Sequence, residues 1–398
     1  MAELISIADA RRRVLEATVT LGTERLPLTD TLDRVLAAPV LASTDVPPFP
    51  SSAMDGYAIE AGPSGRELTV VDESRAGAPS GRRLQGGEAI RISTGAAVPA
   101  GATAVIPQED VEVRDGAIVL GEDVLAGTHV RAAGEVMPAG TLVVAAGTKI
   151  GPAELAAAIA AATGEVTVSR RPLVKVFSTG DELREPGEPL APGEIHNSNG
   201  PMLAAMASRC GAATDFPRVL PDDRAATERG LEEALASGDV VIVSGGVSVG
   251  PHDHVKSALH KLGVKERWWG VALQPGKPTW FGTQDDRLVF GLPGNPVSAA
   301  VTFSLFVAPA LAALQGARGA NQPGTAVLGS DVPRNPRREQ AVRVRLERRD
   351  GATVAVLNGP QGSHVVTSLV GADALALIGA GEGSVAAGTT VQLAPLVR

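Results

Sequence analysis

Cysteine is almost absent from this sequence, in which Cys210 is the only one among 398 residues. A single cysteine excludes an intrachain disulfide and lacks the paired spacing of a zinc or redox site. This scarcity fits a reducing compartment, so we expect a cytoplasmic protein. The first residues, MAELISIADARRRVLEA, place acidic groups before basic ones and show no apolar core ahead of a cleavage site, which predicts no signal peptide.

Long apolar runs and an excess of positive charge are lacking as well. The longest apolar stretches are interrupted by Gly, Ser or charged residues, so we expect no membrane-spanning segment. The formal net charge is -8, whereas nucleic acids and anionic membranes attract proteins rich in Lys and Arg. We therefore expect neither nucleic acid nor a membrane as a main partner.

Aromatic residues make up only 3% of the chain, although 44% of it is hydrophobic. The core must therefore consist mainly of Ala, Val, Leu and Ile, which suits close packing of helices on sheets. The length predicts roughly two to four domains.

The first half of the chain contains few helical patterns. Apolar spacing behind Ser6 predicts a helix at 6–18, and PAELAAAIAAA predicts another at 152–162 that packs against it. Short strand-like runs separated by Gly, Pro and Asp predict a small β-rich domain at 43–136. Residues 1–42 and 137–171 then form one discontinuous, elongated linker domain with helices. The predicted strands are 68–72, 88–92, 104–108 and 117–120.

Residues 172–317 alternate between strand and helix patterns, which predicts a doubly wound parallel sheet and hence an α/β ligand domain. After a Gly-rich linker, period-two patterns with turns at Asp350-Gly351 and Asn358-Gly359 predict a β-barrel-like domain at 318–398. The fold class is thus multidomain α/β plus β. The predicted strands are 173–178, 240–244, 288–292, 341–346 and 353–357, and the predicted helices are 199–209, 224–236, 253–262 and 296–314.

Two glycine-rich loops follow predicted strands at the edge where parallel sheets bind ligands. In SGGVSVG, Ser244, Gly245, Gly246 and Gly250 indicate either a phosphate-binding loop or a tight strand-to-helix turn. In LPGNP, Pro293 and Gly294 precede Asn295 as N-cap and Pro296 at the first helical position, and capping alone accounts for this pattern. Two such loops at one edge favour an anion site.

A third loop, STGDEL, turns at Thr179 and Gly180 and places Asp181 and Glu182 at the strand end. With Asp222 and Asp253 near other strand-end loops, these acids indicate either Mg2+ held between carboxylates and phosphate or solvated loop acids.

Lys277 stands between two prolines in QPGKP. Most lysines are solvated surface residues, but this constrained one suits a phosphate because less entropy is lost on binding.

Six motifs occur in a characteristic order, and their joint occurrence is highly specific. With them the chain resembles the molybdopterin molybdenumtransferase family, to which the C-terminal domain of gephyrin is related, over nearly its whole length. The motifs are SAMDGYA (Ser52 to Ala58), RISTGAAVPAGA (Arg91 to Ala102), STGDEL, SGGVSVG, QPGKP and GLPGNPVS.

The resemblance implies insertion of molybdate into adenylated molybdopterin with release of AMP, while Mg2+ neutralises charge at phosphate. It also implies a homodimer in which the small β domain of one subunit closes over the ligand domain of the other. Asp55, which by itself indicates only a turn with a lone carboxylate, and Thr94 are then catalytic across the interface. The enzyme that adenylates molybdopterin and the recipient molybdoenzymes are further expected partners.

The resemblance also assigns residues in the ligand domain. Glu182, Asp222 and Asp253 correspond to catalytic acids, and Asp181, Glu182 and Asp222 to ligands of Mg2+. The cofactor-binding set is Thr179, Gly180, Asp181, Ser244, Gly245, Gly246, Gly250, Lys277, Pro293, Gly294, Asn295 and Pro296.

Two positions depart from the family pattern. Gln274 stands where the family commonly has Lys, which removes a positive charge suited to an oxyanion. Val136 follows Gly134-Glu135 where the family commonly has Asp, which removes an acid of the small domain.

Two other functions remain open. A molybdopterin adenylyltransferase shares the plan of the ligand domain and predicts ATP consumption, but it lacks the extra domains. A scaffold, as in gephyrin's related domain, predicts partner binding through the outer surface. The basic run Arg334 to Arg349 alternates with Val and Leu, which favours an amphipathic strand over a surface for an acidic partner.

Overall fold

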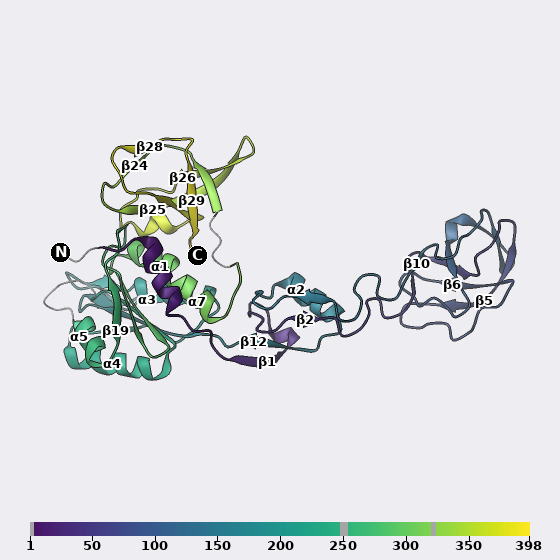
Figure 1. Cartoon of the computed structure of the whole chain (residues 1–398), viewed down its shortest axis with the longest axis horizontal. Coiled ribbons are helices and arrows are strands. Elements are labelled where there is room, and N and C mark those ends of the chain that lie inside the picture. Colours follow the sequence, from purple (N-terminus) through teal and green to yellow (C-terminus); the bar gives the residue numbers. More distant parts are fainter. Residues whose placement is uncertain (1–3, 247–253, 320–323) are drawn as a thin grey trace.

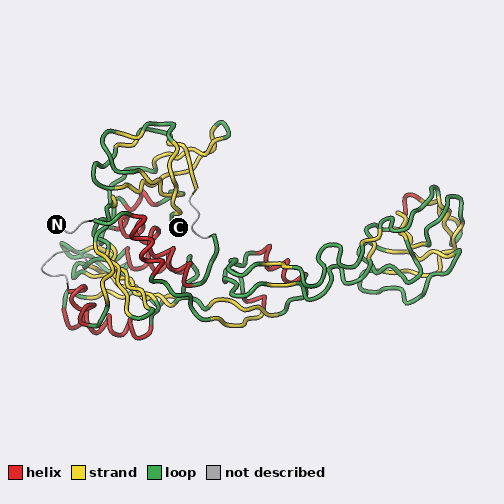
Figure 2. The backbone as a smooth tube through the Cα atoms, in the orientation of Figure 1, coloured by secondary structure: helices red, strands yellow, loops and turns green. Residues whose placement is uncertain are grey.

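The computed structural model describes residues 4–246, 254–319 and 324–398. Figure 1 shows an elongated molecule, with the α/β domain and the C-terminal β domain together at one end. The small β domain lies at the other end, beyond a narrow middle segment. Figure 2 shows that this middle segment is mostly loop and strand.

The small β domain is a six-stranded sheet in the order β7-β4-β6-β5-β9-β8. All four strands predicted from the sequence in this region are present. Ile59, Leu68 and Ile118 are almost completely buried in its core. A Cβ atom on Gly56 would overlap the carbonyl oxygen of Ile106, so the close approach of β4 to β7 requires glycine there. The strands are β4 (Gly56–Ile59), β5 (Glu67–Ser74), β6 (Glu88–Ile92), β7 (Ala104–Pro107), β8 (Val111–Arg114) and β9 (Ala117–Leu120).

The middle segment is built from two two-stranded antiparallel pairs and helix α2 (Pro152–Ala160). Its small apolar core includes Leu36, Val144 and Val168. The pairs are β1 (Thr23–Pro27) with β12 (Glu165–Ser169) and β2 (Val40–Leu41) with β11 (Leu142–Val144). A third pair, β3 (Ser51–Ser52) with β10 (Val130–Arg131), packs on the small β domain (Figure 1).

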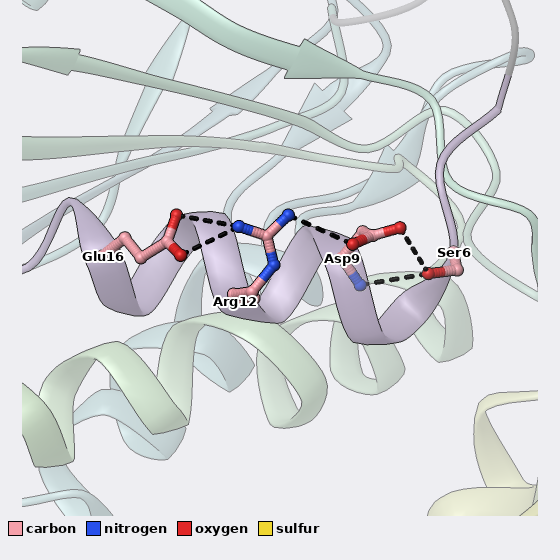
Figure 3. Close-up of polar contacts among 4 residues, drawn as sticks. All are labelled: Ser6, Asp9, Arg12 and Glu16. Carbon is pink, nitrogen blue, oxygen red and sulfur yellow. Dashed lines mark hydrogen bonds and ion pairs between the residues drawn. The ribbon is translucent and has the colours of Figure 1, made fainter.

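Helix α1 (Ile7–Glu16) begins at Ser6, whose hydroxyl accepts the N–H of Asp9 at 3.0 Å. Arg12 pairs with Asp9 and Glu16 on the solvent face (Figure 3). Its buried face, Ile7, Ala10 and Val14, belongs to the core of the α/β domain. The prediction that helix 152–162 packs against the N-terminal helix is therefore wrong, because this apolar face is already buried elsewhere.

The α/β domain has a sheet in the order β16-β13-β18-β22-β21-β19, with β17 also on β13. The strands from β16 to β22 are parallel, whereas β21 and β19 pair antiparallel at one edge and were not predicted. Alternate residues of β18 face opposite layers: Val240 and Ile242 pack with α1, α3 and α6, while Val241 and Val243 pack with α4 and α5.

The bounds of the predicted elements, the strands β13, β18 and β22 and the helices, agree closely with the patterns in the sequence, whereas the short strands β14 to β17 were not predicted. The strands are β13 (Leu173–Thr179), β16 (Ala213–Thr214), β17 (Arg218–Leu220), β18 (Val240–Ser244), β19 (Lys265–Trp269), β21 (Trp280–Gln284) and β22 (Arg287–Leu292). A short pair, β14 (Leu183–Arg184) with β15 (Ile195–His196), follows β13. The helices are α3 (Asn199–Arg209), α4 (Arg224–Ser237), α5 (His254–Lys261), α6 (Pro296–Thr302) and α7 (Ala308–Leu314).

A π-helical turn, Phe303–Val307, joins α6 to α7. Pro309 has no N–H to donate to Leu305, which accounts for the wider turn. The whole helical stretch Pro296–Leu314 is long and apolar enough to cross a membrane, but 89% of it is buried inside the protein. It is apolar on all sides because it is the central helix of the domain core.

The C-terminal domain contains a closed five-stranded barrel, β25-β26-β23-β29-β27, in which β27 pairs back to β25. The predicted turn at Asp350-Gly351 is present, with positive φ at both residues. A short strand of the α/β domain, β20 (Leu273–Gln274), extends this sheet beside β25. The barrel strands are β23 (Gly324–Leu328), β25 (Glu339–Arg349), β26 (Ala352–Leu357), β27 (Ala374–Ile378) and β29 (Thr390–Pro395), and β24 (Val332–Pro333) pairs with β28 (Ser384–Val385) outside them.

Candidate functional site

The strands β13, β18 and β22 end side by side, so the three loops singled out from the sequence lie at one edge of the sheet. Ser178 pairs with Ser244, and Ser244 with Leu292. The chain leaves β13 for β16 on one side and returns to β18 on the other. This reversal is the topological switch point at which open parallel sheets form their ligand crevice.

The glycines after β18 are required by packing. Gly245 and Gly246 have φ of 88° and 62°. Cβ atoms there would lie 2.7 and 2.9 Å from the Thr179 hydroxyl oxygen, so the loop after β18 contacts the end of β13. The N–H of Gly245 also donates to the carbonyl of Leu292 at 3.0 Å. The predicted site residues Gly250 and Asp253 lie outside the described residues.

The loop after β22 contains Pro293 and Gly294 and continues into α6 at Pro296, as predicted. Asn295 has the backbone conformation of an N-cap, but its side chain makes no capping hydrogen bond. Instead its Nδ2 donates to the hydroxyl of Ser363 in the C-terminal domain at 3.1 Å. Side-chain capping therefore does not explain this asparagine.

Of the acidic residues predicted for the site, the structure brings Asp181 and Asp222 into contact. The N–H of Asp222 donates to Oδ1 of Asp181 at 2.9 Å, which joins the loops after β13 and β17. The carboxylate of Glu182 folds back over Gly180, where a Cβ atom would overlap it. No cluster of three or more His, Cys, Asp or Glu suited to a metal occurs in the described part of the chain. Mg2+ commonly uses only one or two carboxylates together with substrate phosphates, so such a cluster is not a requirement for this ion.

Lys277 lies in a loop that rests on α6. Gly276 has φ of 124°, and a Cβ atom there would lie 2.6 Å from the Thr302 methyl group. The hydroxyl of Thr279 donates to the Gly276 carbonyl at 2.6 Å. This fixed turn leaves the Lys277 side chain exposed.

Asp55 and Thr94 lie together, but on the small β domain. Asp55 precedes β4, Thr94 follows β6, and both are exposed. Because this domain lies at the far end of the molecule (Figure 1), one chain does not bring them to its own strand-end loops.

Models of known protein families match three consecutive parts of the chain. Family models match residues 5–164 ("MoeA N-terminal region (domain I and II)"), 175–313 ("Probable molybdopterin binding domain") and 325–396 ("MoeA C-terminal region (domain IV)"). The molybdopterin molybdenumtransferase of Haemophilus influenzae is 34% identical over 98% of both chains. The chain belongs to the molybdopterin molybdenumtransferase family.

Other members of this family agree with that assignment. Molybdopterin molybdenumtransferase 2 of Mycobacterium tuberculosis is 36% identical over 98% of both chains. The crystal structure of the molybdopterin biosynthesis moea protein from Pyrococcus horikosii has a TM-score of 0.84 and 33% identity over 99% of both chains.

Gln274 and Val136, the two positions expected from the resemblance to depart from the family pattern, lie at domain junctions. Oε1 of Gln274 accepts the Nδ2–H of Asn335 at 2.6 Å, which ties the α/β domain to the barrel domain. Val136 lies where the middle segment meets the small β domain, and its side chain is 65% exposed. Neither substitution disturbs a buried core.

Sequence reasoning missed Arg343, which is 1% exposed. The sequence predicted it only as part of the basic run of an amphipathic strand, but closure of the barrel buries its side chain. Its guanidinium donates to Ser368 and to the carbonyls of Pro360 and Gly362, and no carboxylate pairs with it among the described residues. Burial lowers the pKa of Arg343 to about 10.

This buried cation lies close to the loop after β22, which contains Asn295. Ser363, next to Gly362, contacts that loop, since its carbonyl accepts the N–H of Val297 at 3.2 Å. The only signal in the sequence was an Arg between two Val in a strand.

Sequence reasoning also missed Asn197 and Asn199, which precede and begin α3. They are 2% and 9% exposed, and each hydrogen-bonds the last serine of a central strand, Ser178 or Ser244. The sequence indicated only the start of a helix there.

Proposed function

We propose that this chain is a molybdopterin molybdenumtransferase, which inserts molybdate into adenylated molybdopterin and releases AMP in molybdenum cofactor biosynthesis. The observation that carries the proposal is the convergence of three strand-end loops at the switch point. They contain Thr179, Gly245 and Gly294, in a chain with relatives of that name over its full length.

The loops after β18 and β22 offer backbone N–H groups to the phosphates, since their glycines allow close approach. Lys277, on its rigid turn beside α6, adds a cation at low entropic cost. Arg343, behind the contact between Ser363 and Asn295, favours an oxyanion such as molybdate on this side of the site.

Asp181, Glu182 and Asp222 hold Mg2+ in this proposal, and Asp253, outside the described residues, completes the acidic set. Carboxylate oxygens are suitable ligands because Mg2+ prefers hard oxygen donors. When bound, the ion neutralises charge that develops at the phosphate. The chain's own residues orient the adenylate by fixing the loops around it.

The active unit in this proposal is a homodimer in the cytoplasm. Asp55 and Thr94 lie too far along the molecule to serve their own α/β domain, so they complete the site of the partner subunit. The product then passes to recipient molybdoenzymes.

An anaerobic assay tests the function. Purified protein is mixed with adenylated molybdopterin, Mg2+ and molybdate, and AMP release is followed together with reconstitution of a cofactor-free molybdenum enzyme. We expect AMP release that depends on molybdate, and reconstitution. Consumption of ATP with pyrophosphate release would instead identify an adenylyltransferase, and binding without turnover would contradict the proposed activity.

A further inference from the structure

Asn199 connects the two glycine-rich loops of the candidate site. Its Nδ2 donates to the hydroxyl oxygen of Ser244 at 2.9 Å and to the carbonyl oxygen of Gly294 at 2.7 Å. The Ser244 hydroxyl in turn donates to the carbonyl of Pro293 at 3.3 Å. One carboxamide therefore sets the spacing between the loops that follow β18 and β22.

These contacts fix which way the carboxamide points. The carbonyl of Gly294 can only accept a hydrogen bond, so the nitrogen of Asn199 must face it and Oδ1 must point away. Oδ1 is buried and has no hydrogen-bond partner among the residues that the structure describes. Buried acceptors are rarely left unpaired, so Oδ1 of Asn199 lacks a donor. Nδ2 of Asn197, on the same turn, is also buried without a hydrogen-bond partner among the described residues.

The turn that carries Asn199 is itself rigid. Oδ1 of Asn197 accepts from the Ser178 hydroxyl at 2.9 Å and from the N–H of Gly200 at 3.1 Å. Ser178 and Ser244 are register partners on β13 and β18. Asn199 is thus held at the switch point by the two strands that define it.

The chemistry of the free atom limits what can bind there. A phosphate ester ionised at neutral pH offers only acceptors, so it cannot satisfy Oδ1. An N–H group of a nitrogen heterocycle can, and the substrate of the proposed function carries an amino-substituted ring at each end, adenine and pterin.

We propose that Asn199 has two functions at this site: its Nδ2 positions the phosphate-binding loops, and its Oδ1 accepts an N–H from an amino-substituted heterocycle. This inference rests on the proposed function, because it names the part of that substrate which the residue recognises. The heterocycle is either the adenine or the pterin, and the experiment distinguishes them.

The test uses the full-length chain with EDTA present, so that no divalent ion can bridge the contact. Calorimetry measures the affinity for AMP, for IMP, which has an oxo group in place of the adenine amino group, and for 6-hydroxymethylpterin. Asn199→Ala removes both functions, whereas Asn199→Asp keeps an acceptor oxygen and removes the donor. The matched control is Asn358→Ala, since Asn358 Nδ2 also donates to two carbonyls, those of Ser368 and Val370, but in the barrel domain.

If adenine is the partner, Asn199→Ala abolishes a preference for AMP over IMP of about tenfold. If pterin is the partner, this variant weakens binding of 6-hydroxymethylpterin by about tenfold and leaves the ratio of AMP to IMP unchanged. In either case Asn199→Asp keeps the recognition of the ring, and Asn358→Ala changes no affinity.

Unchanged ligand affinities in Asn199→Ala, with a loss of thermal stability like that of Asn358→Ala, would overturn the inference and leave Asn199 a structural residue. Absence of binding to the wild-type chain is a different failure, because it contradicts the proposed function itself.

Discussion

Thr94 donates its backbone N–H to Oδ1 of Asp55 at 2.7 Å, so the two residues predicted to be catalytic on the small β domain form one local unit. They come from different strand ends, before β4 and after β6. The hydrogen bond fixes the carboxylate on an exposed surface far from the strand-end loops of the same chain (Figure 1).

A site shared between subunits predicts complementation. Asp55→Asn and Lys277→Met should each lower molybdate-dependent AMP release by about a hundredfold, because each removes a charge from the site. If the variants are mixed and allowed to exchange subunits, about half the dimers are mixed and hold one intact site, so about a quarter of wild-type activity returns. AMP release by the mixture measures this.

The control for complementation pairs Asp55→Asn with Thr94→Val. Both changes are in the small β domain, so no combination of subunits has an intact site. Activity that stays at the level of the single variants in the first mixture would place the complete site within one chain.

Gly56→Ala should destabilise the small β domain by about 1 to 3 kcal/mol, because its new methyl group overlaps the carbonyl of Ile106. Urea unfolding followed by circular dichroism measures the change. Gly81→Ala is the control in the same domain, since nothing lies within 4 Å of a Cβ atom there. If both substitutions changed the free energy of unfolding equally, the close contact between β4 and β7 would not contribute to stability.

Asp239 joins the middle segment to the α/β domain, since it accepts from Arg170 at 2.8 and 2.9 Å and from the N–H of Leu173 at 2.7 Å. Burial favours a higher pKa for Asp239, but the Arg170 and Leu173 hydrogen bonds outweigh it and hold the pKa below its ordinary value of 3.8. The resulting stabilisation is complete above pH 3.8 and is lost as the pH falls through the lower folded-state value.

Asp239→Asn should therefore lower the free energy of unfolding by about 1 kcal/mol at pH 7 and by much less near pH 2. The expected loss at pH 7 is small because Arg170 is partly exposed and solvent screens its charge. Urea unfolding at the two pH values measures the difference. Asp286→Asn, at an exposed turn, is the control. A loss that is the same at both pH values would show that the carboxylate charge contributes nothing.

Gln274→Lys should place a cation at the position where the resemblance leads us to expect one. We expect the KM for molybdate to fall several-fold, since a lysine ammonium attracts the oxyanion. The hydrogen bond to Asn335 is lost, which should cost about 1 kcal/mol of stability. AMP release at varied molybdate and thermal unfolding measure the two effects, with Gln392→Lys as a control that adds the same charge on the barrel surface. An unchanged KM would remove position 274 from the oxyanion site.

The sequence by itself determined the local elements and the chemistry of the loops. Helix α1 with its Ser6 cap, the buried strand β18 and the Asp350-Gly351 turn follow from side-chain spacing and from φ preferences within a few residues. The order of strands and helices also placed the three loops at one edge of a parallel sheet, because crossover connections in such sheets are regular.

Only the tertiary structure decided which distant residues meet. Asn199 contacts Ser244 across 45 positions and Gly294 across 95, and contacts between segments so far apart leave no periodic signal in the sequence. Arg343 alternates like an exposed residue, yet closure of the barrel buries it. The buried face of α1 was visible in the sequence, but any apolar surface could have covered it, since hydrophobic burial has no direction. Packing of the α/β core, rather than the pattern of the helix, selected that partner.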